Sequence, residues 1–168
     1  MNKLDYQKAA ERTCPPLDTP AMDHTHMIMG ILDEWYETKD EISNMESTGP
    51  DAKENIIKEL GDVFWYVANY CRMFKIDFTN GRDIGMAYDT IAVKLIGIHK
   101  KELAYGKDVV WEEVNYLMQG ILYWLDLTCE LLDVNQSDVF ERNIKKVTAR
   151  FPEKFDANLA INKDESNE

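Results

Sequence analysis

The chain has 168 residues, of which 45% are hydrophobic and 11% are aromatic. A chain of this length can bury a core as one domain, and this composition argues against disorder over most of its length. The formal net charge of −12 disfavours binding along a nucleic-acid backbone, because few phosphates could be neutralised. No nucleic-acid partner is therefore expected, whereas a small polyanionic substrate would need a metal cation or a local basic cluster.

The sequence also shows no membrane or disulfide pattern. No stretch approaches the roughly 20 uninterrupted apolar residues that span a membrane, and the first residues lack the apolar core of a signal peptide. Cys14, Cys71 and Cys129 are widely separated, so they predict reduced thiols and neither a disulfide framework nor a zinc site. We expect a cytoplasmic protein with no membrane partner.

Helical periodicity dominates the chain, and glycine and proline are sparse within the periodic segments. We therefore predict an all-α fold, a bundle of about five to six helices around a four-helix core, in a single domain spanning residues 1–168. A polar tail at residues 156–168 is expected to be frayed. Helices are predicted at residues 4–12, 22–45, 51–75, 82–105, 111–132 and 139–150.

The predicted helix at residues 22–45 carries acidic residues on an otherwise apolar stripe. In "GILDEWYETKDEI", Glu34, Glu37 and Glu41 share one face of the helix, and this face continues the apolar stripe of Met27 and Ile31. A single pair of this kind is more often part of a solvated acidic face. Glu34 and Glu37 alone therefore leave both interpretations open.

The next helix gives the stronger signal. In "ELGDVFWYV", Glu59 and Asp62 stand directly before an unbroken apolar run, which is typical of a buried helix. Charged side chains are rarely buried unless they are paired or bound to a metal. Because a solvated face does not fit an apolar run, we predict that both acids lie in the interior or at the edge of a cleft.

Two helices joined by a short loop are expected to pack antiparallel, which brings the two acidic pairs face to face. Four converging carboxylates would repel one another strongly unless a cation lay between them. Ligands that are all oxygen favour Mg²⁺, with Mn²⁺ as the alternative, over zinc or copper. The sequence thus predicts a hard-cation site formed by Glu34, Glu37, Glu59 and Asp62.

These two segments carry a family resemblance. "GILDEWYETKDEI" followed by "NIIKELGDVFWYVANY" resembles the MazG-like all-α nucleoside triphosphate pyrophosphohydrolases, whose hallmark is an ExxE helix followed by an ExxD helix. The resemblance covers residues 26–70, and "NIKKVTARFPEKF" is similar to the C-terminal stretch of the family. The first motif here begins with Asp33 and Glu34 where the family usually has two glutamates. The region between Phe78 and Leu132 matches less clearly.

The resemblance implies Mg²⁺-dependent hydrolysis of a ribo- or deoxyribonucleoside triphosphate to the monophosphate and pyrophosphate. Glu34, Glu37, Glu59 and Asp62 would be both the metal ligands and the catalytic residues, and Asp33 would support them. Which glutamate acts as general base, and which phosphorus is attacked, stays open. The implied purpose is removal of noncanonical or surplus nucleotides from the pool.

A homodimer or homotetramer is also implied by the family. The large aromatic and methionine content agrees with this, because so short a chain holds more apolar surface than one small bundle hides.

Five residues are candidates for contact with the substrate. Asn143, Lys146 and Arg150 share a polar stripe, which fits either donors to a triphosphate or an ordinary basic face near a helix C-terminus. The resemblance favours the substrate role for Asn143 and Lys146. Tyr66 and Asn69 share the stripe of Asp62 and complete the set, although an aromatic residue at this spacing also fits core packing.

Other functions remain open at this stage. An all-α dUTPase, or an enzyme that hydrolyses an alarmone nucleotide, would use the same acidic pairs. From another class, a non-catalytic acidic helical module would bind a basic partner or a structural cation. His24, His26 and His99 supply no Glu-x-x-His pair of a di-iron bundle, so they are expected to be structural or exposed and not ligands.

Overall fold

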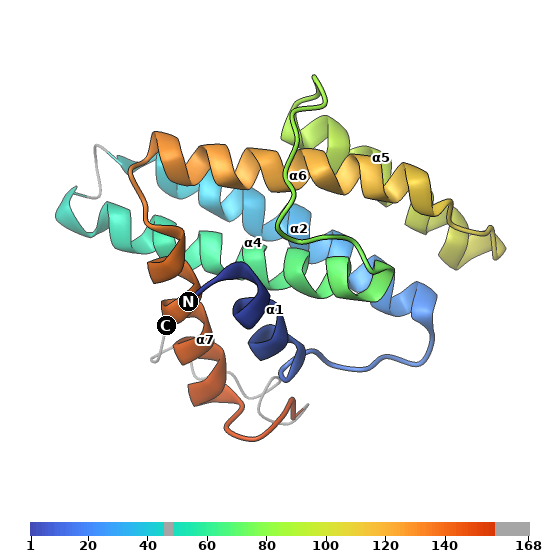
Figure 1. Cartoon of the computed structure of the whole chain (residues 1–168), viewed down its shortest axis with the longest axis horizontal. Coiled ribbons are helices and arrows are strands. Elements are labelled where there is room, and N and C mark those ends of the chain that lie inside the picture. The colour runs from blue at the N-terminus through green and yellow to red at the C-terminus, as the bar shows by residue number, and fades with distance from the viewer. Residues whose placement is uncertain (46–48, 157–168) are drawn as a thin grey trace.

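The computed structural model describes residues 1–45 and 49–156 (Figure 1). These residues form six α-helices and no strand, which confirms the predicted all-α bundle. A 3₁₀ turn, η1 (Gly49–Asp51), precedes the third of these helices. The helices are α1 (Lys3–Glu11), α2 (Pro20–Ser43), α4 (Ala52–Phe74), α5 (Tyr88–Tyr105), α6 (Trp111–Leu131) and α7 (Gln136–Arg150). The tail predicted to be frayed falls, except for Asp156, outside the described residues.

Four helices make the core of the bundle. Helix α2 packs on α4 and α5, and α6 closes the group by packing on the same two helices. Helices α1 and α7 contact each other and pack on α4. Figure 1 shows α2 and α4 running side by side in opposite directions, so the antiparallel packing expected for the two acidic helices is present.

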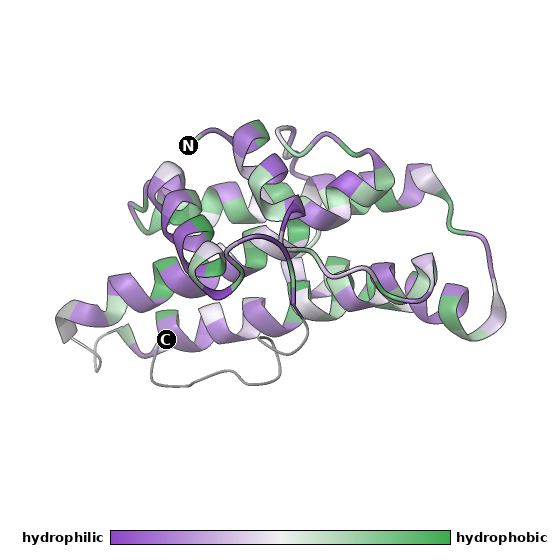
Figure 2. Ribbon diagram, turned by 90° about the horizontal axis from the view of Figure 1, so that it is seen from below, coloured by the Kyte–Doolittle hydropathy of each residue, from purple (hydrophilic) through white to green (hydrophobic). Residues whose placement is uncertain are grey.

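Helix α4 is the centre of the molecule. Leu60, Val63 and Phe64 are completely buried, and the same holds for the following turn at Val67 and Ala68. Figure 2 shows hydrophobic and hydrophilic residues alternating along the helices, as helical periodicity requires of elements that bury one face. A helix buried this thoroughly fixes the side chains that it carries.

Aromatic side chains join α1 and α7 to α4. The rings of Tyr6 and Phe140 stack with their centroids 4.2 Å apart, and Phe64 meets Phe140 edge to face at 5.0 Å. Such pairs add to the stabilisation that burial alone provides. The two terminal helices are thereby held against the helix that carries Glu59 and Asp62.

Most predicted helices agree with the structure to within two residues, but two of their starts do not. Helix α5 begins at Tyr88, six residues later than predicted, because the preceding segment crosses α6. There the backbone N–H of Arg82 donates to the carbonyl of Gln119 (2.9 Å), and Gly85 adopts a positive φ of 68°. Helix α7 begins three residues earlier than predicted, because the Asn135 side chain accepts a hydrogen bond from the backbone N–H of Ser137.

Expectations about membranes and thiols can be compared with the structure directly. Within residues 1–45 and 49–156, no helix combines the length and the hydropathy needed to cross a bilayer. Cys14, Cys71 and Cys129 are free thiols, as predicted, and the last two are buried.

Helix α7 approaches α4 closely at a glycine. A Cβ added to Gly61 would lie 2.9 Å from the Cβ of Asn143, which is closer than real side chains approach. Because the Cβ of Asn143 is tied to its backbone, the clash could be relieved only by moving the helix. Gly61 therefore sets the distance between the two helices that carry Asp62 and Lys146.

We expect Gly61→Ala to lower the free energy of unfolding by about 1–3 kcal/mol, as overpacking of a tight contact does. Gly97→Ala is the matched control, because a Cβ added at that position in α5 meets nothing within 4 Å. The control should gain about 0.5–1 kcal/mol from the better helix propensity of alanine. Urea denaturation of both variants measures the difference. Equal stabilities would contradict the close approach at Gly61.

Candidate active site

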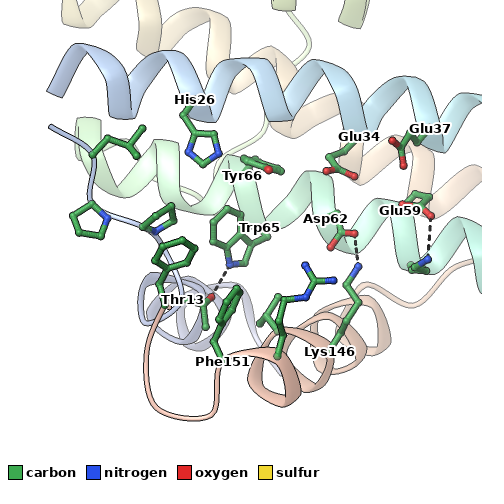
Figure 3. Close-up of a pocket in the computed structure, with 17 residues that line it drawn as sticks. Thr13, His26, Glu34, Glu37, Glu59, Asp62, Trp65, Tyr66, Lys146 and Phe151 are labelled. Carbon is green, nitrogen blue, oxygen red and sulfur yellow. Dashed lines mark hydrogen bonds and ion pairs between the residues drawn. The ribbon is translucent and has the colours of Figure 1, made fainter. Parts of the chain in front are cut away.

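A cavity of about 670 Å³ lies between α2, α4 and α7 and is closed by the segments that follow α1 and α7 (Figure 3). One end of this cavity is charged and the other is apolar and aromatic. The charged end is lined by Glu34, Glu37, Lys58, Glu59, Asp62, Lys146 and Arg150. The aromatic end is lined by Pro15, Pro16, Leu17, Trp65, Tyr66, Phe151 and Phe155.

The antiparallel packing of α2 and α4 brings the acids together. Figure 3 shows Glu34 across from Asp62 and Glu37 across from Glu59. One carboxylate oxygen from each of Glu34, Glu59 and Asp62 lies within 4.8 Å of the other two. Glu37 is exposed and lies outside this acidic trio, although it lines the same cavity.

Asp62 is held by side chains from α7. Asn143 donates from Nδ2 to Asp62 Oδ1 at 2.8 Å, and Lys146 forms an ion pair with Asp62 Oδ2. The amide of Asn143 is oriented in turn by the hydroxyl of Tyr6, which donates to its Oδ1 at 2.8 Å. A carboxylate oxygen has two lone pairs, so these contacts leave Asp62 able to accept a cation as well.

The acidic trio carries more negative charge than its surroundings compensate. The pKa of Glu34 is raised to about 8, first by burial and then by the neighbouring Asp62, Glu37 and Glu59, while Lys146 opposes the shift. The pKa of Glu59 is raised in the same direction, first by burial and then by Asp62. Shifts of this kind mark a site where the lysines present, Lys146 beside Asp62 and Lys58 at 3.8 Å from Glu59, offset the carboxylates only in part.

A hard divalent cation fits this arrangement. The donors are carboxylate oxygens from two rigid helices, and Mg²⁺ and Mn²⁺ prefer such ligands. A cation among Glu34, Glu59 and Asp62 would offset the remaining negative charge, and Glu37 lines the same cavity one turn further along α2. Asp33 is exposed and lines a separate shallow hollow of α2 beside Tyr66, so it does not reach this cavity.

The structure separates the five residues predicted to contact substrate into two groups. Lys146, Arg150 and Tyr66 line the cavity. Asn143 is only 4% exposed and contacts Asp62 instead. Asn69 is fully buried, donates from Nδ2 to the carbonyl of Trp65 at 3.0 Å, and lies outside the cavity lining.

The aromatic end of the cavity is formed partly by the segment after α1 and the segment after α7, which lie near the two termini of the chain. Trp65 donates from Nε1 to Thr13 Oγ1 at 2.9 Å, which ties the segment after α1 to α4. The guanidinium of Arg12 donates to the carbonyls of Pro152 (2.8 Å) and Glu153 (2.9 Å), and so holds the segment after α7 in place. No local pattern in residues 13–17 predicts this wall, because its contacts with α4 form only in the folded chain.

Glu59 and Asp62, the two members of the trio on α4, should affect stability differently when their charge is removed. Without metal, Glu59→Gln should leave the free energy of unfolding unchanged or raise it, because it relieves repulsion within the trio. Asp62→Asn should lower it by about 1–3 kcal/mol, because Lys146 and Asn143 lose a charged acceptor. Urea denaturation in EDTA compares the two variants. If Asp62→Asn proved as stable as Glu59→Gln, the contacts from α7 would contribute nothing.

Comparison with known proteins agrees with this geometry. Residues 22–103 match the family model of the MazG nucleotide pyrophosphohydrolase domain. The matched segment contains α4, all but the start of α2 and all but the end of α5. It therefore includes the four predicted metal ligands, Glu34, Glu37, Glu59 and Asp62. No curated protein and no solved structure matches the chain. The match to this domain at residues 22–103 is consistent with the MazG-like superfamily of nucleotide pyrophosphohydrolases.

Proposed function

We propose that the protein hydrolyses nucleoside triphosphates to monophosphates and pyrophosphate with Mg²⁺. The observation that carries this proposal is the acidic trio of Glu34, Glu59 and Asp62, within 4.8 Å of one another, in a cavity that also contains basic side chains. The match to the family model supports the reaction class. The choice of Mg²⁺ rests on the all-oxygen donor set.

At the charged end of the cavity, the acidic residues would bind the metal and the basic residues would bind the phosphates. Glu34, Glu37, Glu59 and Asp62 would hold the cation, with Mn²⁺ as an alternative to Mg²⁺. When bound, the metal neutralises charge on the phosphates and lowers the pKa of a coordinated water. Lys146 and Arg150, on the α7 side of the same cavity, would donate to phosphate oxygens.

A glutamate must also accept the proton of the attacking water. Glu34 and Glu59 are the candidates, because both have raised pKa values and both belong to the trio. Asp33 would act only indirectly, from the outer side of α2. Asn143 would position Asp62 and not contact the phosphates, since it is buried behind that carboxylate.

We assign the aromatic end of the cavity to the nucleobase. Trp65, Tyr66 and Phe151 offer flat apolar surfaces at this end, which suits a base that stacks. The ring of His26 points into the same cavity in Figure 3, and its buried Nδ1 has no hydrogen-bond partner among the described residues. The volume of the cavity lies in the range typical of small-molecule sites.

The proposal extends to the cellular role and the oligomeric state of the enzyme. We propose a role in removing surplus or noncanonical nucleotides in the cytoplasm. We also propose assembly as a homodimer or homotetramer, which is supported by apolar side chains on the outer side of α2 that are strongly exposed, Met29 at 61% and Tyr36 at 49%.

The reaction is tested by measuring pyrophosphate release from ribo-, deoxyribo- and modified nucleoside triphosphates, including dUTP, with Mg²⁺ and with EDTA. We expect release with Mg²⁺ and none with EDTA. Loss of a metal ligand in Glu59→Gln should reduce the rate by at least the roughly 10–100-fold that loss of a supporting residue causes. Glu54→Gln, an exposed acid of the same helix, should retain the rate of the unaltered chain.

Release confined to dUTP would assign the chain to the dUTPases. No release from any substrate by folded protein, with Mn²⁺ also tried, would reject the enzyme and favour the non-catalytic interaction module. Full activity of Glu59→Gln would reject the metal site while leaving the reaction itself intact.

The raised pKa of Glu34 makes the stability of the metal-free protein depend on pH. The folded chain binds this proton more tightly than the unfolded chain, whose glutamate pKa is near 4.5. The free energy of unfolding in EDTA should therefore fall as pH rises from about 4.5 to about 8. Denaturation across this range should show a smaller fall for Glu34→Gln. An unchanged slope in that variant would contradict the assignment.

A further inference from the structure

A second polar cluster lies at the other end of α2, away from the candidate active site. His24 of α2 and His99 and Glu102 of α5 each place one ligand atom within 4.8 Å of the other two. His24 Nδ1 lies 3.0 Å from Glu102 Oε1, and His99 Nδ1 lies 2.7 Å from Glu102 Oε2. We call these three residues the histidine triad. It contains two of the three histidines of the chain.

The histidine triad is separate from the acidic trio. His24 precedes Glu34 by ten residues on the same helix, which corresponds to about 15 Å along its axis. None of the triad residues lines the candidate active-site cavity. Figure 1 places the start of α2 and the ends of α4 and α5 at one end of the bundle. A function of the triad would therefore be distinct from the hydrolysis proposed above.

We propose that His24, His99 and Glu102 form a binding site for a divalent transition metal, with Zn²⁺ as the best match. Two imidazoles and one carboxylate are a common set of protein ligands for zinc, and they differ in kind from the all-oxygen set that Mg²⁺ prefers. Tetrahedral zinc would separate its ligand atoms by about 3.3 Å, given zinc–ligand distances of about 2.0–2.2 Å. The triad already spans a similar space, so only small side-chain shifts are needed.

The surroundings of the triad suit a metal. Tyr70 lies with its hydroxyl 2.7 Å from Nε2 of His99, so the nitrogen that does not face Glu102 has an oxygen partner. Such partners orient ligating histidines in metal sites. The ring of Phe74 covers both imidazoles, with centroid distances of 4.3 Å to His24 and 5.6 Å to His99. Glu102 remains 17% exposed and His24 14%, which leaves a path for the ion.

The metal-free and metal-bound forms differ in the position of ring protons. A carboxylate only accepts hydrogen bonds, so without metal both Nδ1 atoms must carry a proton, and neutral His99 accepts from the hydroxyl of Tyr70 through Nε2. Burial lowers the pKa of His99, which favours that neutral form. A metal on Nδ1 would displace the proton to Nε2, and His99 would then donate to the oxygen of Tyr70. The direction of that hydrogen bond reverses on binding.

The test is proton–nitrogen NMR of the histidine rings in the metal-free protein, with and without one equivalent of Zn²⁺, in excess Mg²⁺ to fill the acidic trio. We expect the Nδ1 signals of His24 and His99 to move together and their protons to appear on Nε2. His26 serves as the internal reference and should not change. Absence of any change in His24 and His99 would overturn the proposal and leave the triad as a hydrogen-bond network.

Variants locate the bound ion. His24→Ala should weaken Zn²⁺ binding by at least about 100-fold, and Tyr70→Phe by roughly 10-fold or more, whereas His26→Ala should leave the affinity unchanged. Binding that survives His24→Ala, or that is lost in Glu59→Gln, would place the zinc in the acidic trio and overturn the assignment. These measurements need no substrate, so they stand whether or not the chain hydrolyses nucleotides.

Discussion

The structure depends on three carboxylates that lie close together in a partly buried site. Glu34, Glu59 and Asp62 repel one another, and only a rigid fold keeps them within 4.8 Å. The buried helix α4 supplies this rigidity, because its other faces are packed against α1, α6 and α7. Helix α7 also contributes Lys146, the cation that partly offsets the repulsion. The terminal helices thus support the site both by packing and by charge.

The fold was largely predictable from the sequence because its signals are local. Helical periodicity and turn residues gave the all-α class and most helix ends to within two residues. The start of α5 was not predictable in this way. Residues 82–87 have a helix-compatible sequence, but contacts with α6 hold them in another conformation, as in the hydrogen bond from Arg82 to the carbonyl of Gln119. No local pattern encodes a contact between segments that meet only after folding.

In the candidate site, too, local motifs were predictable from the sequence, whereas contacts between distant segments were not. The pairing of acids on α2 and α4 was predictable, since both motifs have helical spacing and short loops favour antiparallel neighbours. The contact from Tyr6 to Asn143 joins residues 137 positions apart, and it orients the amide that donates to Asp62. The aromatic wall beyond Trp65 depends on Arg12 and the carbonyls after α7 in the same way. The residues that complete the cavity, including Lys146, lie outside the segment that matches the family.

The two polar clusters of α2 differ in how far they depend on a cation. The histidine triad has a metal-free arrangement in which the carboxylate of Glu102 accepts from two neutral imidazoles and the hydroxyl of Tyr70 donates to Nε2 of His99. That cluster is therefore stable with or without metal, and binding changes only which atoms carry protons. The acidic trio has no such arrangement, because its carboxylates can donate nothing to one another unless one is protonated. Beyond the contacts of Asp62 with Asn143 and Lys146, a proton or a further cation would relieve the repulsion in the trio, so occupancy of the cavity would affect the stability of the packing between α2 and α4.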